Sequence, residues 1–528
     1  MIGARALLAS LVGAGVDVCF MNPGTSEMHF VSALDSEPGM RGVLALFEGV
    51  ATGAADGYAR IAGRPAAVLL HLGPGLGNGL ANLHNARRAA SPVVNIVGAH
   101  ATGHVRHDAP LQSDIEAMAR TVSGWVRTSG SPRDLARDAM RAVAAAGRPG
   151  GGQVATLVLP ADVSWSEGAD PAPPRALAPA EPVPGRQVGA AAGLLGEGTV
   201  VLLGGQALTE PGLRAASRIA RATGARLLAE TFPARMERGA GVPAVDRLAY
   251  LAEQATAQLA GTRRLMLAGA RSPVAFFAYP GQEGDLVPAG CAVAELAGPG
   301  QDVAGALEEL AGKVAPGTGP LLAQPSVPAS GTGPLSVTNP LSVTNPLSVT
   351  SLAAAVAASL PEGAIVVDEA NTSGIALPGA LAGAARHSLL TLTGGAIGQG
   401  LPAATGAAVA APDRPVLALE ADGSALYTIQ ALWTQARERL NVTTVLLNNS
   451  AYAILRMELA RTNAGQPGER AARMLDLSGP TPGFTQISAG LGVPARRVAT
   501  AGELASALQE AYAEPGPHLI EAVVPPLA

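Results

Sequence analysis

The chain has 528 residues, too many for a single hydrophobic core, and this length predicts two to four domains. Its formal net charge is −5, with acids and bases interspersed, which argues against a nucleic-acid-binding stripe or a polybasic membrane patch. No run is long and apolar enough to span a membrane, and the two cysteines, Cys19 and Cys291, match no metal-ligand spacing. We expect both thiols to be buried and reduced, in a cytoplasmic protein.

The first segment, residues 1–170, alternates apolar stretches with helical stretches rich in small residues. Its opening reads as an amphipathic helix followed by a strand, and a signal peptide is the weaker alternative. Stretches such as "VDVCFMNPG", "AAVLLHLGPG" and "SPVVNIVGAH" are continuous in their apolar character, which is typical of strands buried on both faces of a parallel sheet. The Pro-rich stretch from Asp170 to Arg186 reads as a linker.

A second α/β block is predicted over residues 187–315, with strands in "GTVVLLGGQAL", "GARLLAE", "RRLMLAGA" and "CAVAEL". Residues 316–350 contain a tandem "PLSVTN" repeat and are predicted to be an extended Pro-rich linker. A third α/β block follows over residues 351–528. The expected fold is therefore α/β, with three domains that are each an open parallel sheet flanked by helices.

Polar residues follow two successive apolar strands in the third block. "RPVLALEADG" ends at Asp422, and "VTTVLLNN" ends at Asn449, 27 residues later, which is room for one helix and the next strand. Ligands of open α/β sheets bind at the carboxyl ends of strands, and hard oxygen donors suit Mg²⁺ bridging to phosphate. The alternative is that Asp422 only caps the helix that follows it.

These residues resemble the motif of the thiamine diphosphate (ThDP) enzymes, the family of acetolactate synthase, pyruvate decarboxylase and benzoylformate decarboxylase. The resemblance covers nearly the whole chain and implies three domains in the order pyrimidine-binding, central and diphosphate-binding. It implies that Asp422, Asn449 and the carbonyl of Ala451 hold Mg²⁺. The family usually has Gly where this chain has Ala421, and we expect the extra methyl to fit.

The resemblance also assigns the rest of the cofactor site. Glu48, in "LALFEGVATGAADGYARIAG", matches the family glutamate that bonds the aminopyrimidine; read alone, it could be a helix-start residue stabilised by the helix dipole. In "TGGAIGQGLPAATG", Ile397 matches the residue that bends the cofactor, although it could be plain core, and the Gly395 carbonyl would accept from the pyrimidine amine. The remaining implied cofactor contacts are Pro23, Asn78, Asn371, Thr372, Gly423, Ser424, Tyr452 and Ala453. In this family Glu48 and the diphosphate site come from different subunits, so a homodimer is the expected minimum and a homotetramer is common.

Several features bear on which ThDP enzyme this is. "NPGTSE", with Thr25, and His71 in "LLHLGPGLGN" resemble benzoylformate decarboxylase, in which a histidine at this position acts in catalysis. His107 matches the first of the paired histidines of pyruvate decarboxylases, although it could be a surface residue, and an imidazole there could relay protons. Leu455 replaces the catalytic Glu of pyruvate decarboxylases, and Glu458, one turn on, could enter the substrate pocket instead.

The segment "GARSPVAFFAYPGQ" aligns with the one that carries a second histidine in benzoylformate decarboxylase, but it offers only an apolar wall that includes Phe276, Phe277 and Tyr279. No G-x-G-x-x-G occurs in the central block, so FAD is not expected there.

The first hypothesis is a ThDP- and Mg²⁺-dependent 2-oxo acid decarboxylase (a lyase) or carboligase, like benzoylformate decarboxylase. The alternative is a transferase of the acetolactate synthase large-subunit type, which condenses two 2-oxo acids; His71 argues against it. A non-catalytic ThDP-binding scaffold and a Mg²⁺-nucleotide-binding module are the hypotheses from other classes.

Overall fold

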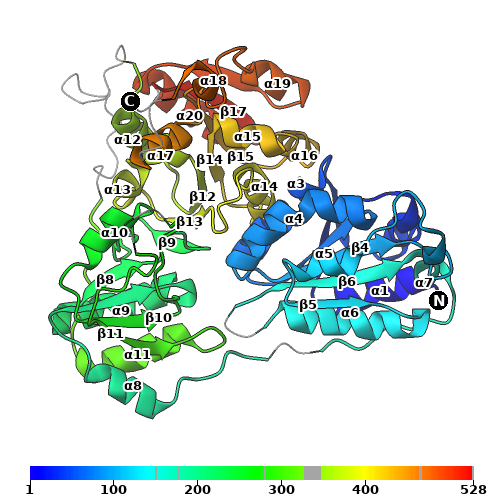
Figure 1. Ribbon diagram of the computed structural model, residues 1–528, viewed down its shortest axis with the longest axis horizontal. Coiled ribbons are helices and arrows are strands. Elements are labelled where there is room, and N and C mark those ends of the chain that lie inside the picture. The colour runs from blue at the N-terminus through cyan, green and yellow to red at the C-terminus, as the bar shows by residue number, and fades with distance from the viewer. Residues whose placement is uncertain are drawn as a thin grey trace.

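The computed structural model describes residues 1–148, 151–175, 178–278, 281, 283–325, 346–462 and 467–525. Three lobes are visible, and each is built around its own sheet (Figure 1). Most of the linker predicted over residues 316–350, namely 326–345, lies outside the described residues, as does Tyr279.

The N-terminal lobe holds six parallel strands in the order β2-β1-β3-β4-β6-β5. Its strands are β1 (Val18–Asn22), β2 (Arg41–Leu44), β3 (Ala66–Leu70), β4 (Val93–Ala99), β5 (Trp125–Thr128) and β6 (Val154–Pro160). Its helices are α1 (Gly3–Gly13), η1 (Thr25–Glu27), α2 (Met28–Ala33), η2 (Leu34–Ser36), α3 (Glu48–Ala62), α4 (Leu72–Arg88), η3 (Val105–His107), α5 (Ile115–Arg120), α6 (Pro132–Ala146) and α7 (Ala161–Trp165). β3 is buried along its whole length, as its unbroken apolar sequence predicts.

The central lobe holds four parallel strands in the order β11-β10-β7-β8. Its strands are β7 (Thr199–Leu203), β8 (Arg226–Ala229), β10 (Arg264–Ala268) and β11 (Ala292–Ala297). Its helices are α8 (Gly185–Ala192), η4 (Gly205–Leu208), α9 (Glu210–Thr223), α10 (Ala252–Leu259) and α11 (Val303–Val314). Cys19 is buried as expected, but Cys291, just before β11 at the edge of this sheet, is partly exposed.

The C-terminal lobe holds seven strands in the order β16-β17-β15-β14-β12-β13-β9. Its strands are β12 (Ala364–Glu369), β13 (His387–Thr391), β14 (Val416–Ala421), β15 (Val442–Asn448), β16 (Ala495–Val498) and β17 (His518–Val523), with β9 (Met236–Arg238) added from the middle of the chain. Its helices are α12 (Val349–Ser359), η5 (Asn371–Gly374), α13 (Leu377–Leu381), α14 (Gly400–Ala410), α15 (Asp422–Thr428), α16 (Ala431–Arg437), α17 (Ala453–Arg461), α18 (Glu469–Arg473), α19 (Phe484–Gly490) and α20 (Ala501–Ala513).

The three-sheet α/β prediction is confirmed, with one addition. β9 pairs antiparallel with β13 and closes one edge of the C-terminal sheet, so this sheet is mixed. A strand of three residues has no readable periodicity, and for this reason the sequence did not predict it.

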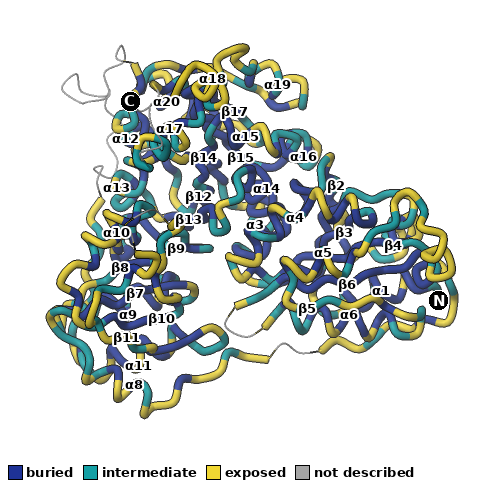
Figure 2. Tube along the Cα trace, viewed as in Figure 1, coloured by how far each residue is buried: buried dark blue, intermediate teal, exposed yellow. Residues whose placement is uncertain are grey.

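Helices α3 and α14 join the N-terminal and C-terminal lobes into one packed unit. A Cβ on Gly57 would lie 2.1 Å from the Ala403 carbonyl oxygen, and a Cβ on Gly406 would lie 1.8 Å from the Ala54 carbonyl oxygen. The two backbones approach closely because each helix puts a glycine against the other. Buried residues of both sheets consequently form one hydrophobic cluster, and the tube in Figure 2 is dark blue through this junction.

Among the described residues, no helix combines the length and the apolar character needed to cross a membrane.

Candidate active site

Asp422 stands where β14 ends and α15 begins, and its carboxylate joins two neighbouring strand ends. One oxygen, Oδ1, accepts from the Gly423 N–H at 2.8 Å. The other, Oδ2, accepts from the N–H groups of Ser450 at 2.7 Å and Asn449 at 3.1 Å, which follow β15. The residue is 2% exposed, and burial raises the pKa of its carboxyl group above the usual range, against these hydrogen bonds. Asp422 therefore ties the β14 and β15 ends together and is more than a helix cap.

Ala421, which replaces the family glycine, adopts φ −77° and ψ 146°, an extended conformation open to any residue. The next residue, Gly423, does need to be glycine. A Cβ there would lie 2.5 Å from the ring of Tyr452, which covers this turn. The chain thus keeps a glycine where packing requires it and tolerates alanine where it does not.

Asn449 and Ser424 extend the polar cluster toward η5. Asn449 accepts from the Ala451 N–H at 3.0 Å through Oδ1 and donates to Ser373 Oγ at 3.1 Å through Nδ2. Asn371, which has φ +49°, donates to Ser424 Oγ at 3.0 Å and is followed by Thr372 in the same turn. Of this group only Ser373 was not expected from the sequence.

The oxygen donors assembled here suit a hard divalent cation. Asp422 supplies a buried carboxylate, Asn449 a side-chain carbonyl oxygen, and Ala451 a backbone carbonyl in the turn after β15. Mg²⁺ and Ca²⁺ prefer such ligands, and the charge of a cation would offset the burial of the Asp422 carboxylate. Ala453, two residues on, starts α17 and is buried.

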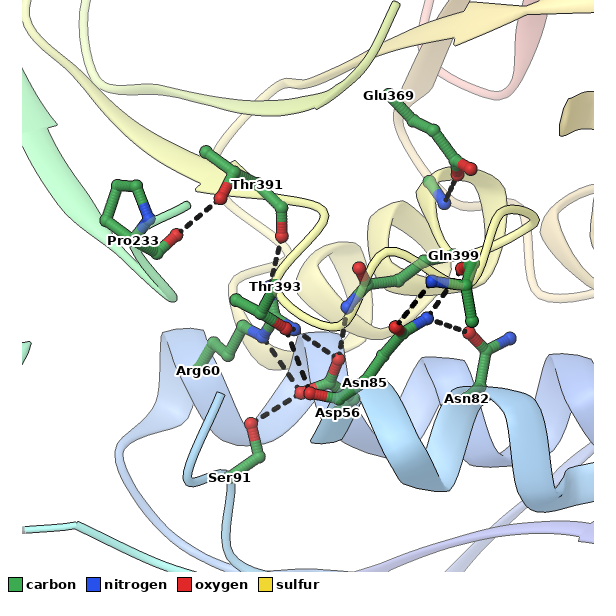
Figure 3. Close-up of polar contacts among 12 residues, drawn as sticks. Asp56, Arg60, Asn82, Asn85, Ser91, Pro233, Glu369, Thr391, Thr393 and Gln399 are labelled. Atoms are coloured by element: carbon green, nitrogen blue, oxygen red, sulfur yellow. Dashed lines mark hydrogen bonds and ion pairs between the residues drawn. The ribbon is translucent and has the colours of Figure 1, made fainter. Parts of the chain in front are cut away.

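The loop between β13 and α14 is held by asparagines of α4 (Figure 3). Asn85 donates to the Ala396 carbonyl at 2.8 Å and accepts from the Ala396 N–H at 3.2 Å. Asn82 donates to the Gly398 carbonyl at 3.1 Å. The N-terminal lobe therefore fixes the backbone of a loop that belongs to the C-terminal lobe.

Gly395 and Ile397 lie within this loop. Gly395 is exposed with φ +75°, a left-handed conformation that favours glycine, and the nearest atom to a Cβ there would be Phe276 Cε1 at 4.0 Å. Ile397 is half-buried, so it is not a core residue of this chain. Both expected cofactor contacts are thus accessible at the surface of the loop.

A buried ion-pair network lies beneath the same loop (Figure 3). Asp56 of α3 is fully buried and binds Arg60 with both oxygens, at 2.8 Å and 2.6 Å. Asp56 also accepts from Ser91 Oγ and from Gln399 Nε2, each at 2.5 Å. Arg60 in turn donates to Thr393 Oγ1 at 2.8 Å. Arg60 lies one helical turn from Asp56, but Ser91 and Gln399 lie 35 and 343 residues from Asp56, which is why the network could not be predicted from the sequence.

Two further glutamates are buried side by side in the C-terminal sheet. Glu369 of β12 and Glu420 of β14 are partners in the strand register and are 3% and 0% exposed. Burial raises the pKa of Glu369 to about 7, although N–H groups of the loop at 398–400 donate to it. Burial, and next the Glu369 carboxyl group, hold the pKa of Glu420 well above its usual range. Neither residue was singled out from the sequence.

Glu48 is the first residue of α3, shortly after β2 ends at Leu44. Its Oε2 accepts from Nδ2 of Asn78 at 3.0 Å. Glu48 is half-buried and Asn78 exposed, so the carboxylate is open to an outside group. Pro23, half-buried after β1, lies at the same end of the N-terminal sheet.

His71 is held by a buried glutamate that sequence reasoning missed. His71 Nδ1 lies 2.8 Å from Glu27 Oε2, which also accepts from the Gly24 N–H at 2.8 Å. Glu27 is 0% exposed, and burial raises the pKa of its carboxyl group, against the Gly24 and His71 interactions. A Cβ on Gly98 would lie 1.6 Å from Glu27 Oε1, so that glycine makes the space. The glutamate of "NPGTSE" was visible in the sequence, but its partner was not.

His107 is exposed in η3 and lies in a row of three imidazoles. Its ring centroid is 5.5 Å from that of His104, which is 5.2 Å from that of His100. Arg106 Nε approaches His107 Nε2 at 3.3 Å. Within the described residues, no hydrogen bond joins this row to His71.

The expected substrate-pocket residues lie on separate elements. Thr25 begins η1 and is exposed, and Leu455 on α17 is 47% exposed. Glu458 lies 2.6 Å from Arg461 on the same helix. Together these two line a small pocket whose other walls come from the central lobe: Tyr250, Leu251, Ala252, Phe276 and Phe277. The apolar wall expected from "VAFF" is therefore present beside Glu458.

The chain matches two family models. "Thiamine pyrophosphate enzyme, N-terminal TPP binding domain" matches residues 1–119, and the C-terminal TPP binding domain of the same enzymes matches residues 372–522. A Mycobacterium tuberculosis protein, IlvX, provisionally described as an acetolactate synthase large subunit, is 62% identical over 531 residues, with 100% of both chains covered. A benzoylformate decarboxylase of Pseudomonas aeruginosa is 31% identical over 551 residues, with 96% of each covered. The solved structure of a ThDP-dependent 4-hydroxybenzoylformate decarboxylase of Rhodococcus jostii superimposes with a TM-score of 0.84 at 26% identity, covering 99% of each chain.

The regions matched by the two family models contain the site residues described above. The N-terminal family model covers the lobe elements that carry Glu48 and His71, and the C-terminal model covers those that carry Asp422 and Asn449. The similarity to the M. tuberculosis and P. aeruginosa proteins extends over essentially the full length of the chain. The chain belongs to the thiamine diphosphate-dependent enzymes and has their three-lobed α/β fold.

Proposed function

We propose that this enzyme is a ThDP- and Mg²⁺-dependent decarboxylase or carboligase of 2-oxo acids, resembling benzoylformate decarboxylase. The observation that carries the proposal is the His71–Glu27 pair, in which a buried carboxyl group orients an imidazole at 2.8 Å beside the strand end that precedes α4. A histidine held in this way can deliver or accept a proton at a fixed position. The full-length similarity to a benzoylformate decarboxylase supports the same activity.

In this proposal the polar cluster at the ends of β14 and β15 binds the cofactor's diphosphate and its metal. Asp422, Asn449 and the Ala451 carbonyl hold Mg²⁺. The contacts to the diphosphate and its surroundings are Asn371, Thr372, Gly423, Ser424, Tyr452 and Ala453. The oxygen donors and the buried charge of Asp422 support this assignment.

The remaining cofactor contacts are proposed on the loop 395–397 and on the N-terminal lobe. Ile397 and the Gly395 carbonyl face the cofactor from the loop, and Glu48, with Asn78 and Pro23 nearby, receives the pyrimidine. When bound, the cofactor would supply the nucleophilic carbon and the electron sink that 2-oxo acid chemistry needs, and these residues would hold it. Glu48 hydrogen-bonds the pyrimidine through its carboxylate, which the Asn78 amide orients.

His71 and the pocket beside α17 are proposed to act on the substrate. His71 orients the substrate carboxylate or moves a proton through Nε2, because Nδ1 is engaged by Glu27. Thr25 offers a hydroxyl at the same end of the N-terminal sheet. Leu455 and Glu458 bound the substrate's side chain from α17, and His107 is a second proton-relay candidate.

The second candidate is an enzyme of the acetolactate synthase type, which condenses two 2-oxo acids. The 62% identity to the M. tuberculosis protein so described is the observation that favours it. The two candidates share every cofactor contact and differ only in what the acceptor is: a proton, or a second carbonyl compound.

A panel of 2-oxo acids, including benzoylformate and pyruvate, separates the two candidates when both CO₂ release and the carbon product are measured. The first candidate predicts an aldehyde from an aryl or branched 2-oxo acid. Acetolactate as the main product from pyruvate, detected as acetoin after acidification, would establish the second and overturn the first. A chain that releases no CO₂ from any member of the panel would contradict both.

The assembly proposed with this function is at least a homodimer, and a homotetramer is the preferred state, acting in the cytoplasm without bound FAD. In the family, Glu48 and the diphosphate cluster of one site come from two subunits. Sedimentation and flavin absorbance of the purified protein test these points directly.

A further inference from the structure

Glu369 lies at the end of β12, where its side chain meets the start of α14. The strand register sets it directly beside Glu420 of β14, and both carboxyl groups are enclosed, at 3% and 0% exposure. A buried carboxyl group is costly unless its oxygens are bonded, so its contacts identify what it stabilises.

The Glu369 contacts converge on three consecutive residues of the loop. Oε1 accepts from the Gly398 N–H at 2.7 Å, and Oε2 accepts from the Gly400 N–H at 2.5 Å. The Gln399 N–H and the Ser424 hydroxyl also donate to this carboxyl group. One side chain thus holds the backbone between the loop and α14, as Figure 3 shows for one of these bonds.

The other side of the same peptide units is also fixed. Gly398 has φ +88°, and its carbonyl accepts from Asn82 at 3.1 Å and from Thr428 at 2.9 Å. Its N–H is the group that Glu369 holds. The N–H and the carbonyl of Gly398 are therefore both hydrogen-bonded. For this reason Glu369 and Asn82 together set the orientation of the preceding residue, Ile397.

There is little room for the pair to relax. A Cβ on Gly400 would lie 2.1 Å from Glu420 Oε2 and 3.0 Å from Glu369 Cβ. Glu420 lies against Glu369 and the Leu401 N–H, whereas the hydrogen bonds from the Gly398 and Gly400 N–H groups are accepted by Glu369 alone. The two glutamates are therefore matched in burial and chemistry but differ in what they hold.

We propose that Glu369 is a positioning residue that holds the loop from Gly395 to Gly398 in the shape that receives the cofactor, before the cofactor binds. The inference rests on the proposed placement of ThDP against Gly395 and Ile397. Glu369 meets the polar cluster at Asp422 only through the Ser424 hydroxyl, and in the described contacts it bonds to none of the residues Asp422, Asn449 and Ala451. Its effect is therefore on the part of the cofactor that the loop contacts.

The test compares Glu369→Gln with Glu420→Gln in the full-length protein. A glutamine at 369 turns an N–H toward one of the two glycine N–H groups, so one hydrogen bond is replaced by a clash of donors. A glutamine at 420 is nearly isosteric and leaves those two bonds in place. Hydrogen exchange of the Gly398 and Gly400 amides is measured without cofactor, and the binding of ThDP and of inorganic pyrophosphate, each with Mg²⁺, is measured by calorimetry.

We expect Glu369→Gln to speed exchange of both amides and to weaken ThDP binding, each by about 10-fold or more, since a charge-assisted hydrogen bond is lost. Pyrophosphate binding should stay within about twofold, because the contacts of Asp422 to Asn449 and Ser450 and that of Asn371 to Ser424 do not involve Glu369. Glu420→Gln should leave all three quantities within about twofold, and Glu369→Asp, which keeps the charge, should restore part of the loss.

Equal weakening by Glu420→Gln, parallel loss of pyrophosphate binding, or unchanged exchange in Glu369→Gln would each overturn the proposal. If Glu369→Gln does not fold, Glu369→Asp and Glu420→Gln decide the same question by the same exchange measurement. Failure of the wild-type chain to bind ThDP would contradict the proposed function instead, and the exchange of the two amides would still report whether Glu369 holds the loop.

Discussion

Glu27 and His71 are bonded at 2.8 Å across two different strand ends of the N-terminal sheet, with the glutamate entirely enclosed and the imidazole half-buried. The orientation of the histidine is thus decided by a residue that the substrate does not need to touch. In the proposed function this arrangement separates two tasks, since Nδ1 is bonded to Glu27 and Nε2 is the nitrogen that would act on the substrate.

Replacing Glu27 by Gln tests this separation. The amide cannot make the charge-assisted hydrogen bond that orients the His71 ring, so we expect kcat/KM for the best 2-oxo acid to fall by about 10-fold or more. The loss should appear in kcat, while ThDP affinity stays unchanged. The exposed Glu167 in the same lobe provides the control, since Glu167→Gln should have no effect. A kcat in Glu27→Gln no lower than that of the control would show that the orientation of His71 by Glu27 does not matter for turnover.

Glu48→Gln removes the carboxylate proposed to work on the cofactor. The amide oxygen can still accept from Asn78, so the unfolding temperature should stay within about 2 °C. Turnover should fall on the order of 100-fold, the usual size of a general acid–base contribution. Glu37→Gln, before the start of β2, is the matched control. Turnover at the wild-type rate in Glu48→Gln would show that the assigned site is wrong.

Asp422→Asn should abolish the Mg²⁺ requirement and most of the cofactor affinity together. The substitution removes a buried charge that also accepts from Ser450 and Asn449. We expect ThDP affinity, measured at a Mg²⁺ concentration that saturates the wild type, to fall by about 10-fold or more. Asp413→Asn, in the exposed turn just before β14, should bind normally. Normal, Mg²⁺-dependent binding by Asp422→Asn would contradict the metal site.

Asp56→Asn should destabilise the junction between the N-terminal and C-terminal lobes. The substitution removes the negative charge that pairs with the Arg60 guanidinium, and Arg60 is only 7% exposed. Breaking one side of a buried ion pair costs about 3–5 kcal/mol, measurable as a fall in the denaturant midpoint. The exposed Asp35 gives the control variant, Asp35→Asn. A stability loss no larger than that of the control would mean that the network is not a structural link.

His387 of β13 should make stability fall in mild acid. It is 2% exposed, its Nδ1 donates to the Ala385 carbonyl at 2.8 Å, and burial lowers its pKa to about 4. The unfolded chain takes up a proton near pH 6.5 and the folded chain only near pH 4, so this contribution is present above about pH 6.5 and is lost between these values, by about 3 kcal/mol. The difference in unfolding free energy between His387→Gln and wild type should therefore change over pH 7 to about 4, whereas exposed His29→Gln should show no such change. A constant difference would contradict the assignment.

The parts of the fold that the sequence predicted are those with local signals. The unbroken apolar runs became β3, β7 and β15, and the polar residues at Asp422 and Asn449 came together because parallel neighbours end on one side of a sheet. These inferences need only strand order and direction.

The parts that could not be predicted are pairings between distant residues. Glu27 contacts His71 and Asp56 contacts Gln399, across separations of 44 and 343 residues. Contacts over such separations leave no periodic pattern in the sequence. Glu369 and Glu420 read as interruptions of apolar strands, and only the register shows that they interrupt both strands at the same point. The identity of the substrate could not be predicted either. In the proposed site it depends on the shape of the pocket between Tyr250, Phe276 and α17.

The close packing of α3 against α14 at their glycines has a consequence for how the chain can be divided into fragments. Gly57 and Gly406 let each helix rest on the other's backbone, so the first and last thirds of the polypeptide share one interior although the central lobe separates them in sequence. Cleavage of the backbone in the segment after the central lobe removes no residue from this shared hydrophobic cluster. Two fragments made separately should then reassemble by complementation, whereas either outer third made alone would leave an apolar helix face uncovered and would aggregate.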